Sequence, residues 1–154
     1  GVDFAELKAA FKKNWQKGKY VRGASTITQQ LAKNLYLSTD KSVIRKIKEY
    51  LIARRLESRL GKNRIFELYL NVIEFGPGIF GVQAAAKFFF DKNVSGLNLE
   101  EMVRLTAVIP KPLKETPTGN SSWINWKAGC IMDTLRRYKY IEQKEYQEVK
   151  AKFN

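Results

Sequence analysis

The hydrophobic residues of this chain recur at intervals of three and four, which is the spacing of α-helices that bury one face. Phe4, Leu7, Phe11 and Trp15 form the first such stripe, and Gly18 follows as a stop signal. Similar patterns predict further helices over residues 25–35, 42–60, 65–72, 98–109, 123–138 and 142–151. Only Tyr20-Val21 and a few short apolar runs favour a strand, so we expect one mainly α domain without repeats or linkers.

Turn-forming residues separate the predicted helices. Gly76-Pro77-Gly78 breaks the chain after the helix that ends at residue 72. Asn98 with Glu101 three residues later is typical of a capping box, and Pro110 stops the helix that this box opens. Residues 82–90 form an apolar run that looks buried, and residues 110–122 are expected to form a loop.

The third predicted helix carries the most informative polar pattern. At about 100° per residue, Lys41, Arg45, Lys48 and Glu49 fall within an arc of about 100°. The cations can neutralise a diphosphate, and the acid can hold a metal ion or order the cations. The alternative is a solvated face on which Arg45 and Glu49 form an ordinary i,i+4 pair. A core stripe is expected beside this arc, made of Ile44, Ile47 and Leu51.

The segment from Gly23 to Asn34 gathers hydroxyl and amide side chains at a helix start, where backbone N–H groups are free. Ser25, Gln29 and Lys33 are successive i+4 neighbours, so their donors share one face and suit a sugar or a phosphate. The alternative is plain N-capping by Ser25 or Thr26 beside exposed glutamines.

The amino-acid composition of the chain limits which kinds of catalysis and which partners are possible. The chain has 154 residues, of which 44% are hydrophobic, so it can bury a core of about one domain. Its 28 Lys and Arg exceed 15 Asp and Glu, and the net charge of +13 indicates an anionic partner. The absence of His excludes His-based catalysis, and the single Cys130 excludes an intrachain disulfide. No apolar run reaches the roughly 18 residues of a membrane-spanning helix.

Four segments, in order, resemble motifs of glycosyltransferase family 51, the peptidoglycan glycosyltransferases. Residues 23–34 resemble the signature G-[GA]-S-T-I-[ST]-Q-Q-L-x-K-N, and residues 45–49 resemble R-K-x-x-E. Residues 62–71 are similar to K-x-x-I-x-x-x-Y-L-N, and residues 78–86 to G-x-x-G-x-x-A-A-A. One such motif would be a weak signal, whereas four in register are specific.

The resemblance implies a lysozyme-like domain that polymerises lipid II into glycan strands. The anomeric carbon of the growing strand is joined to the 4-hydroxyl of the incoming lipid II with inversion, and undecaprenyl diphosphate leaves. The implied partners are lipid II, the growing strand, an anionic bilayer and other cell-wall synthesis proteins, with no nucleic acid. The implied location is the outer face of the bacterial cytoplasmic membrane. A monofunctional enzyme is slightly favoured over a domain of a bifunctional penicillin-binding protein.

The resemblance also implies roles for individual residues. Glu49 matches a glutamate that supports the diphosphate, directly or through a divalent cation such as Mg²⁺ or Mn²⁺. Lys33, Arg45 and Lys48 match basic residues expected at the diphosphate. Lys41 stands where the family often has Arg; Lys keeps the charge but loses the bidentate fork.

Other matched positions are expected to shape the site. The polar residues expected to line the same cleft are Ser25, Gln29 and Gln30. The residues expected to position helices are Tyr69, Leu70 and Asn71, and those expected to serve turns and close packing are Gly76, Gly78 and Gly81.

One motif of the family has no match. Its general-base glutamate belongs to a motif that ends in His-x-Gly, and Gly1-Val2-Asp3-Phe4 resembles the segment directly after that His. We therefore expect residues 1–154 to be a glycosyltransferase domain truncated at its N-terminus, with the base and a membrane anchor upstream and no polymerase activity of its own. The remaining acids considered are expected to be helix-surface or capping residues: Glu57, Glu67, Glu74, Glu100 and Glu101.

Two other functions remain open on the sequence alone. A muramidase on the same fold would need a single acid of raised pKa but no cationic cluster. A non-enzymatic helical module would bind nucleic acid or an anionic membrane through diffuse charge. The tryptophans are expected to pack in the core or at an interface rather than to serve as sugar platforms: Trp15, Trp123 and Trp126. Tyr36 and Leu37, flanked by cations, are expected to dip into the bilayer interface.

Overall fold

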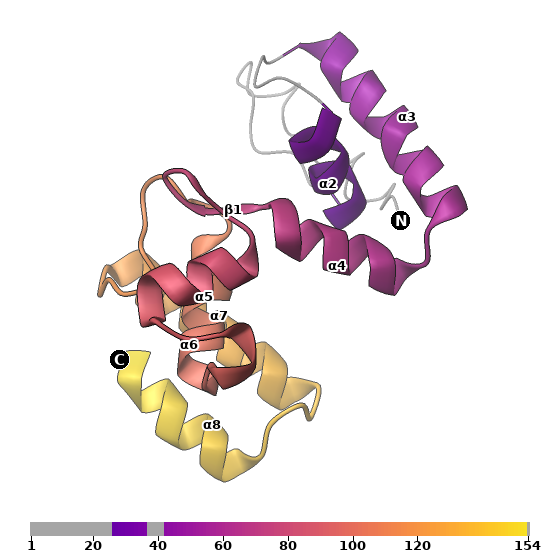
Figure 1. Ribbon diagram of the computed structural model, residues 1–154. Helices are drawn as coiled ribbons and strands as arrows, with labels where there is room; N and C mark the ends of the chain where they lie inside the picture. The colour runs from indigo at the N-terminus through magenta and orange to yellow at the C-terminus, as the bar shows by residue number, and fades with distance from the viewer. Residues whose placement is uncertain (1–25, 37–41, 154) are drawn as a thin grey trace, which may run out of the picture. The chain divides into compact units, whose positions relative to one another are not determined.

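The computed structural model describes residues 26–36 and 42–153 (Figure 1). Helices dominate this part of the chain, which confirms the mainly α fold and agrees with the lysozyme-like domain that the resemblance implies. The predicted helix over residues 4–15 and the Tyr20-Val21 segment lie outside the described residues. The chain divides into two compact units, residues 1–72 and residues 73–154.

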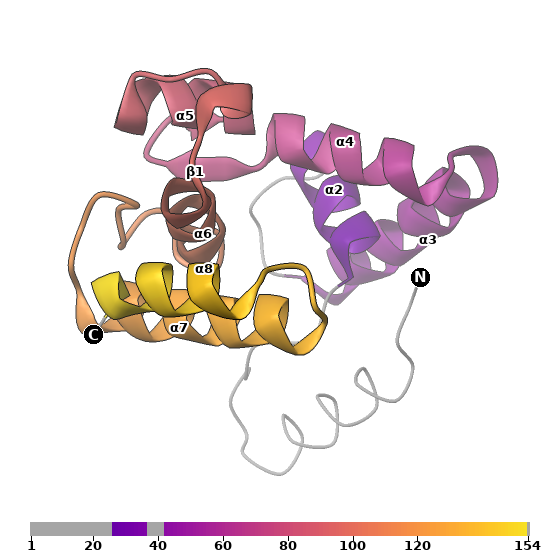
Figure 2. The same cartoon turned by 90° about the horizontal axis from the view of Figure 1, so that it is seen from below.

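The first unit contains α2 (Ile27–Tyr36), α3 (Val43–Arg59) and α4 (Lys62–Val72). Helix α2 packs against both α3 and α4 (Figure 2). Leu31 and Ala32 of α2 are fully buried, and Ala53 of α3 is buried with them in this unit's interior. The predicted stripe of α4 is confirmed at Ile65 and Tyr69, which are both buried.

The face that α3 buries differs from the prediction. The buried residues of α3 are Glu49 and Ala53, which lie one turn apart. The predicted core stripe faces outward, since Ile44, Ile47 and Leu51 are 68%, 55% and 55% exposed. Helix α3 packs on α2, and the side of α3 that carries Glu49 and Ala53 is the buried one. The apolar pattern of α3 therefore misassigned its inner face.

Helix α2 departs from its predicted stripe as well. Of Ile27, Leu31 and Leu35, only Leu31 is buried. The inner face instead includes Thr28 and Ala32, which lie three residues before and one residue after Leu31. A turn of polar residues is therefore buried within this unit.

The second unit begins with a hairpin. Strands β1 (Glu74–Gly76) and β2 (Ile79–Phe80) pair antiparallel and precede α5 (Val82–Phe90). Gly78 and Gly81 have φ of 74° and 85°, a region that favours glycine, so both turn positions need this residue. Helix α5 buries Ala85 and Ala86, but Phe88 is largely exposed, so the predicted burial of residues 82–90 holds only in part.

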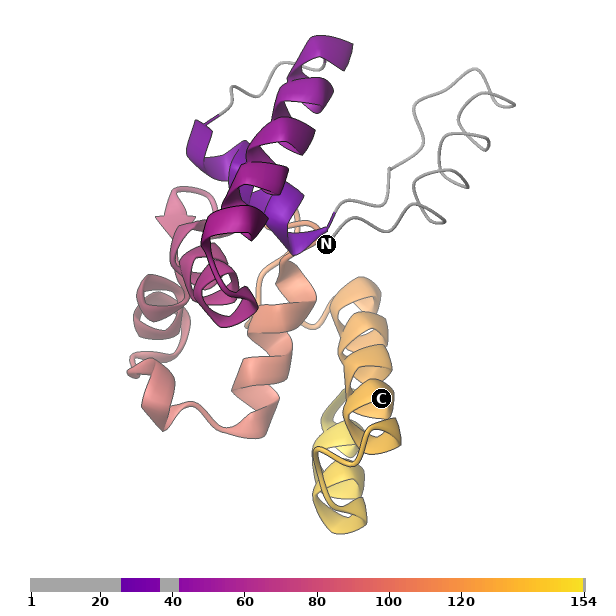
Figure 3. The same cartoon turned by 90° about the vertical axis from the view of Figure 1, so that its right-hand side faces the viewer.

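The rest of this unit consists of η1 (Val94–Gly96), α6 (Leu99–Val108), α7 (Ser122–Arg137), α8 (Gln143–Lys150) and η2 (Ala151–Phe153). Helix α6 packs on α7, and α7 lies beside α8 (Figure 3). The predicted capping box is confirmed, because Asn98 and Glu101 exchange hydrogen bonds at the start of α6. The core here includes Phe75, Val103, Ile124 and Met132.

Candidate functional site

A buried carboxylate with two cations lies on α3. Glu49 is only 2% exposed. Arg45 Nη1 lies 3.3 Å from Glu49 Oε2, and Lys46 Nζ pairs with Oε1. These residues precede Glu49 by one helical turn, which brings their side chains to the same face. Ser42 starts the helix by accepting a hydrogen bond from the Arg45 N–H at 3.0 Å. We call Arg45, Lys46 and Glu49 the Glu49 cluster.

The burial of Glu49 differs from the solvated face that the alternative interpretation of α3 predicts. The predicted i,i+4 pair with Arg45 is present, but its carboxylate is buried rather than solvated. A buried carboxylate is stable only when charge and hydrogen bonds compensate its desolvation. Here two cations are held against one buried carboxylate.

Two further features add positive character to this helix. Lys48 is exposed and pairs with no carboxylate within the described residues. Arg45 Nε is buried and has no hydrogen-bond partner there. Sequence reasoning did not single out Lys46, although its i,i+3 spacing from Glu49 was the available signal.

The polar start of α2 shows the N-capping by Thr26 that the sequence left open as an alternative. The Thr26 N–H donates to Gln29 Oε1, and the Gln29 N–H donates to Thr26 Oγ1, each at 3.3 Å. This reciprocal pair caps α2, and Gln29 is buried, so the alternative of exposed glutamines does not hold at this position. Lys33 is exposed, while Ser25 and Lys41 lie outside the described residues.

A hydrogen bond joins two of the predicted motifs. Tyr69 OH on α4 donates to Gln30 Oε1 on α2 at 3.1 Å. Burial raises the pKa of the Tyr69 hydroxyl, which keeps it a neutral donor. Asn71 donates from Nδ2 to the Glu67 carbonyl at 2.8 Å within α4. Tyr69 therefore connects helices, and Asn71 acts within its own helix.

The described residues hold no group of three or more Asp, Glu, Cys or His side chains that could bind a metal ion. Both carboxylate oxygens of Glu49 already accept hydrogen bonds, Oε2 from Arg45 and Oε1 from Lys46. A divalent cation there would have to take most of its ligands from a bound diphosphate.

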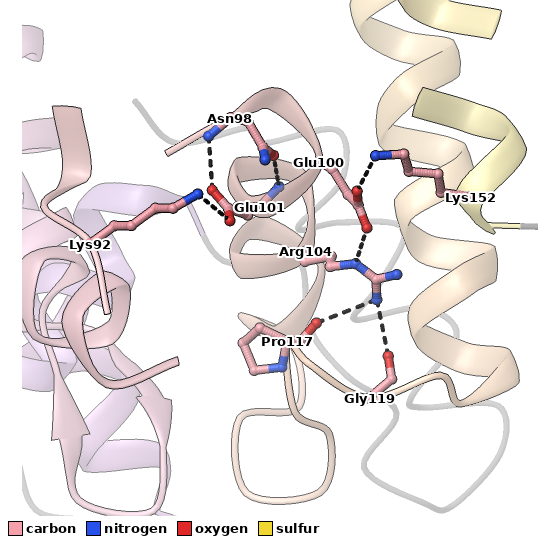
Figure 4. Close-up of polar contacts among 8 residues, drawn as sticks. All are labelled: Lys92, Asn98, Glu100, Glu101, Arg104, Pro117, Gly119 and Lys152. Carbon is pink, nitrogen blue, oxygen red and sulfur yellow. Dashed lines mark hydrogen bonds and ion pairs between the residues drawn. The ribbon is translucent and has the colours of Figure 1, made fainter. Parts of the chain in front are cut away.

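A second carboxylate with two cations occurs in residues 73–154 (Figure 4). Glu100 pairs with Arg104 Nε at 3.0 Å and with Lys152 Nζ at 2.7 Å. Arg104 Nη1 also donates to the carbonyls of Pro117 at 3.4 Å and Gly119 at 3.0 Å. We call Glu100, Arg104 and Lys152 the Glu100 cluster. Its acid is not the ordinary surface residue that was expected, because it ties α6 to the C-terminal turn.

The electrostatics of the Glu100 cluster agree with a structural role. Burial by itself raises the pKa of Glu100, but hydrogen bonds and charges from Lys152 and Arg104 outweigh it and lower the pKa. The Arg104 guanidinium also lies over the Phe153 ring, 5.0 Å from its centroid. Both cations of this cluster therefore contact Glu100, and Arg104 also contacts two loop carbonyls and an aromatic ring.

These features together define a helical protein with a buried, cation-paired acid and a local excess of positive charge. The transglycosylase family model matches residues 1–136 of the chain. The chain therefore belongs to the transglycosylase family.

Curated relatives agree with this assignment. The chain is 50% identical over 112 residues to the biosynthetic peptidoglycan transglycosylase of Methylobacillus flagellatus. The aligned segment covers 73% of this chain and 49% of the relative. The chain is also 44% identical over 142 residues to the protein of the same name from Chromobacterium violaceum, covering 92% of the chain and 61% of the relative. The chain thus spans about half to three fifths of these relatives. Within the described residues no helix is both long and apolar enough to cross a membrane.

Proposed function

We propose that this protein polymerises peptidoglycan glycan strands from lipid II, transferring the growing strand to the acceptor 4-hydroxyl with inversion. The observation that carries the proposal is the Glu49 cluster, a buried acid that holds two cations on one helix face. The names of the curated relatives support the same reaction.

The chemistry of the reaction requires such a cluster. As the glycosidic bond to the diphosphate breaks, negative charge accumulates on the leaving group. Cations that are already held in place stabilise this charge without the cost of reorganising at the moment of reaction. Glu49 fixes Arg45 and Lys46, and the exposed Lys33 and Lys48 add mobile positive charge.

Inversion needs no covalent intermediate, in contrast to retaining glycosidases. The acceptor hydroxyl needs a base, which the family resemblance assigns to a motif not matched within residues 1–154. Glu49 is a poor candidate for that base, since both of its carboxylate oxygens already accept hydrogen bonds, one from Arg45 and one from Lys46. We therefore assign Glu49 to the leaving group and to positioning.

The divalent cation and the location form part of the same proposal. Glu49 can contribute one ligand to Mg²⁺ or Mn²⁺ only if the diphosphate supplies the others. A lipid-linked donor places the reaction at the anionic surface of the cytoplasmic membrane, in the cell envelope. The net charge of +13 suits that surface.

The test is polymerisation of lipid II by the full-length protein and its Glu49→Gln variant. The amide keeps the size of the side chain but no longer pairs with Arg45 and Lys46, so we expect turnover to fall by about 100-fold. The matched control is Glu67→Gln in the same unit, which removes an exposed 2.7 Å pair with Arg64 and should leave turnover unchanged.

Unchanged turnover in Glu49→Gln would show that the assigned role is wrong. The length of the product separates the proposed function from the muramidase alternative. A transglycosylase lengthens glycan when lipid II is supplied, whereas a muramidase shortens existing strands without it.

A further inference from the structure

An aromatic pair with a lysine lies at the first turns of α7. The rings of Trp123 and Trp126 are 5.2 Å apart and tilted by 48°. Lys111 Nζ sits 3.3 Å from the centroid of the Trp123 ring. Trp126 is 58% exposed, so of the two expected positions for this side chain, the core or an interface, the core is excluded. We call Lys111, Trp123 and Trp126 the tryptophan platform.

The outward position of Trp126 follows from the helix. The residues that α7 buries are Ile124, Ala128 and Met132, each separated from the next by one turn. Trp126 is two residues from Ile124, about 200° around the helix, so its indole lies on the outer side. The other exposed residues of α7 are polar, namely Ser122, Asp133, Thr134 and Arg137, so the helix lacks the broad apolar outer face of a membrane-surface helix.

Lys111 is fixed in place without being neutralised. Its backbone N–H donates to the Val108 carbonyl at 2.9 Å, and its carbonyl accepts from the N–H groups of Lys114 and Glu115 at 3.0 Å. Its ammonium lies over the Trp123 ring and pairs with no carboxylate within the described residues. A positive charge that is ordered by a ring, and free of an acid, is ready for an anionic ligand.

We propose that the tryptophan platform is a binding subsite for an acidic amino-sugar strand. The exposed indole of Trp126 stacks on the C–H face of a pyranose ring, and Lys111 binds a carboxylate carried by the strand. Such a strand is the product of the proposed function, on which this inference rests. The subsite lies in residues 73–154, whereas the Glu49 cluster lies in residues 1–72.

The direct test is calorimetric titration of the full-length protein with two probes. One probe is the neutral N-acetylglucosamine tetrasaccharide, and the other is uncross-linked peptidoglycan strand carrying stem peptides. Trp126→Ala should weaken the binding of both probes by about tenfold, and Trp126→Tyr should restore most of it because a flat ring remains. The matched control is Tyr140→Ala, which removes a ring that is 77% exposed outside the platform and should change neither affinity.

The lysine is tested by its selectivity. Lys111→Met keeps most of the apolar stem but removes the charge, so binding of the acidic strand should weaken several-fold while binding of the neutral tetrasaccharide stays unchanged. Lys114→Met removes an exposed charge from the same turn and is the matched control. Equal losses for both probes in Lys111→Met would contradict the carboxylate contact.

The inference is overturned if neither probe binds, or if Trp126→Ala binds both as the parent does. It is also overturned if Trp126→Ala leaves strand binding intact but lowers the affinity for phosphatidylglycerol vesicles, because the indole then serves a bilayer. The titration needs no turnover. Absence of strand binding by a parent protein that polymerises normally therefore argues against the platform alone, and strand binding by a parent protein that does not polymerise argues against the proposed function alone.

Discussion

The Glu49 and Glu100 clusters contain the same groups, one carboxylate and two cations, in different settings. Arg45, Lys46 and Glu49 lie within a single turn of α3. Glu100 and Arg104 are also one turn apart, but Lys152 reaches Glu100 from 52 residues away. The first cluster is thus made by one helix, and the second is completed by the tertiary fold.

This difference indicates that the Glu49 cluster is available for catalysis, whereas the Glu100 cluster stabilises the fold. The guanidinium of Arg104 pairs with Glu100, donates hydrogen bonds to two loop carbonyls and lies over the Phe153 ring. In the Glu49 cluster, by contrast, Arg45 Nε is buried and has no hydrogen-bond partner among the described residues. Mutations in the Glu100 cluster should therefore change stability, and mutations in the Glu49 cluster should change turnover.

The largest effect on stability is expected from Arg104→Met. This change leaves Glu100 and the carbonyls of Pro117 and Gly119 without their buried donor, so the free energy of unfolding should fall by about 3 kcal/mol. Denaturant unfolding measures the change. Arg64→Met, which breaks an exposed pair, is the control and should have little effect. If Arg104→Met lowers the free energy of unfolding by less than about 1 kcal/mol, the Glu100 cluster does not have the structural role that distinguishes it from the Glu49 cluster.

Lys46→Met tests the other side of the comparison. It removes one of the two cations from Glu49, so turnover of lipid II should fall about tenfold, equivalent to about 1.4 kcal/mol in the barrier. Lys46 is partly exposed, so the free energy of unfolding should change by less than about 1 kcal/mol. Steady-state kinetics and unfolding of the same preparation check both values. A large stability loss with normal turnover would reverse the assignment.

Glu100→Gln should show a characteristic dependence on pH. The pKa of Glu100 is lowered in the folded state, so its stabilisation is present above its ordinary value of 4.5 and is lost as the pH falls through the folded pKa. At neutral pH the variant should be about 1 kcal/mol less stable than the parent, and this gap should close in acid. Unfolding curves recorded from pH 7 to pH 3 test this. A gap that stays constant would mean that the charge of Glu100 contributes nothing.

The smallest effect is expected from Lys152→Met. Its ammonium is more than half exposed, so loss of the pair with Glu100 should cost about 0.5 kcal/mol. Lys144→Met removes a looser exposed pair of 4.0 Å and should be neutral in the same thermal unfolding assay. If both variants behave alike, Arg104 alone holds the cluster together.

Local patterns were predicted well because their cause is local. The capping box of Asn98 and Glu101 and the pair of Arg45 with Glu49 follow from spacing along one helix. The glycines at 78 and 81 follow from backbone geometry at a turn. Such contacts form whatever packs against the helix, so the sequence is enough to find them.

Features that depend on a neighbouring element were missed. Ile44, Ile47 and Leu51 looked like a core stripe, yet α3 packs through Glu49 and Ala53. Trp126 lies outside the core, which was one of its two expected positions, and nothing in the sequence pattern indicated that Lys152 pairs with Glu100. Which face of a helix is buried depends on the shape of the partner helix, which no pattern within a single helix contains.

The amino-acid sequence by itself determined the helices, their caps, the motifs and the family to which the chain belongs. The tertiary structure alone decided that Glu49 and Gln29 are buried and that Glu100 pairs with Lys152, which joins α6 to the C-terminal turn. The physical reason is the distance along the chain over which each interaction acts. Capping and i,i+4 pairing act within one turn, whereas desolvation of a charge depends on everything packed around it.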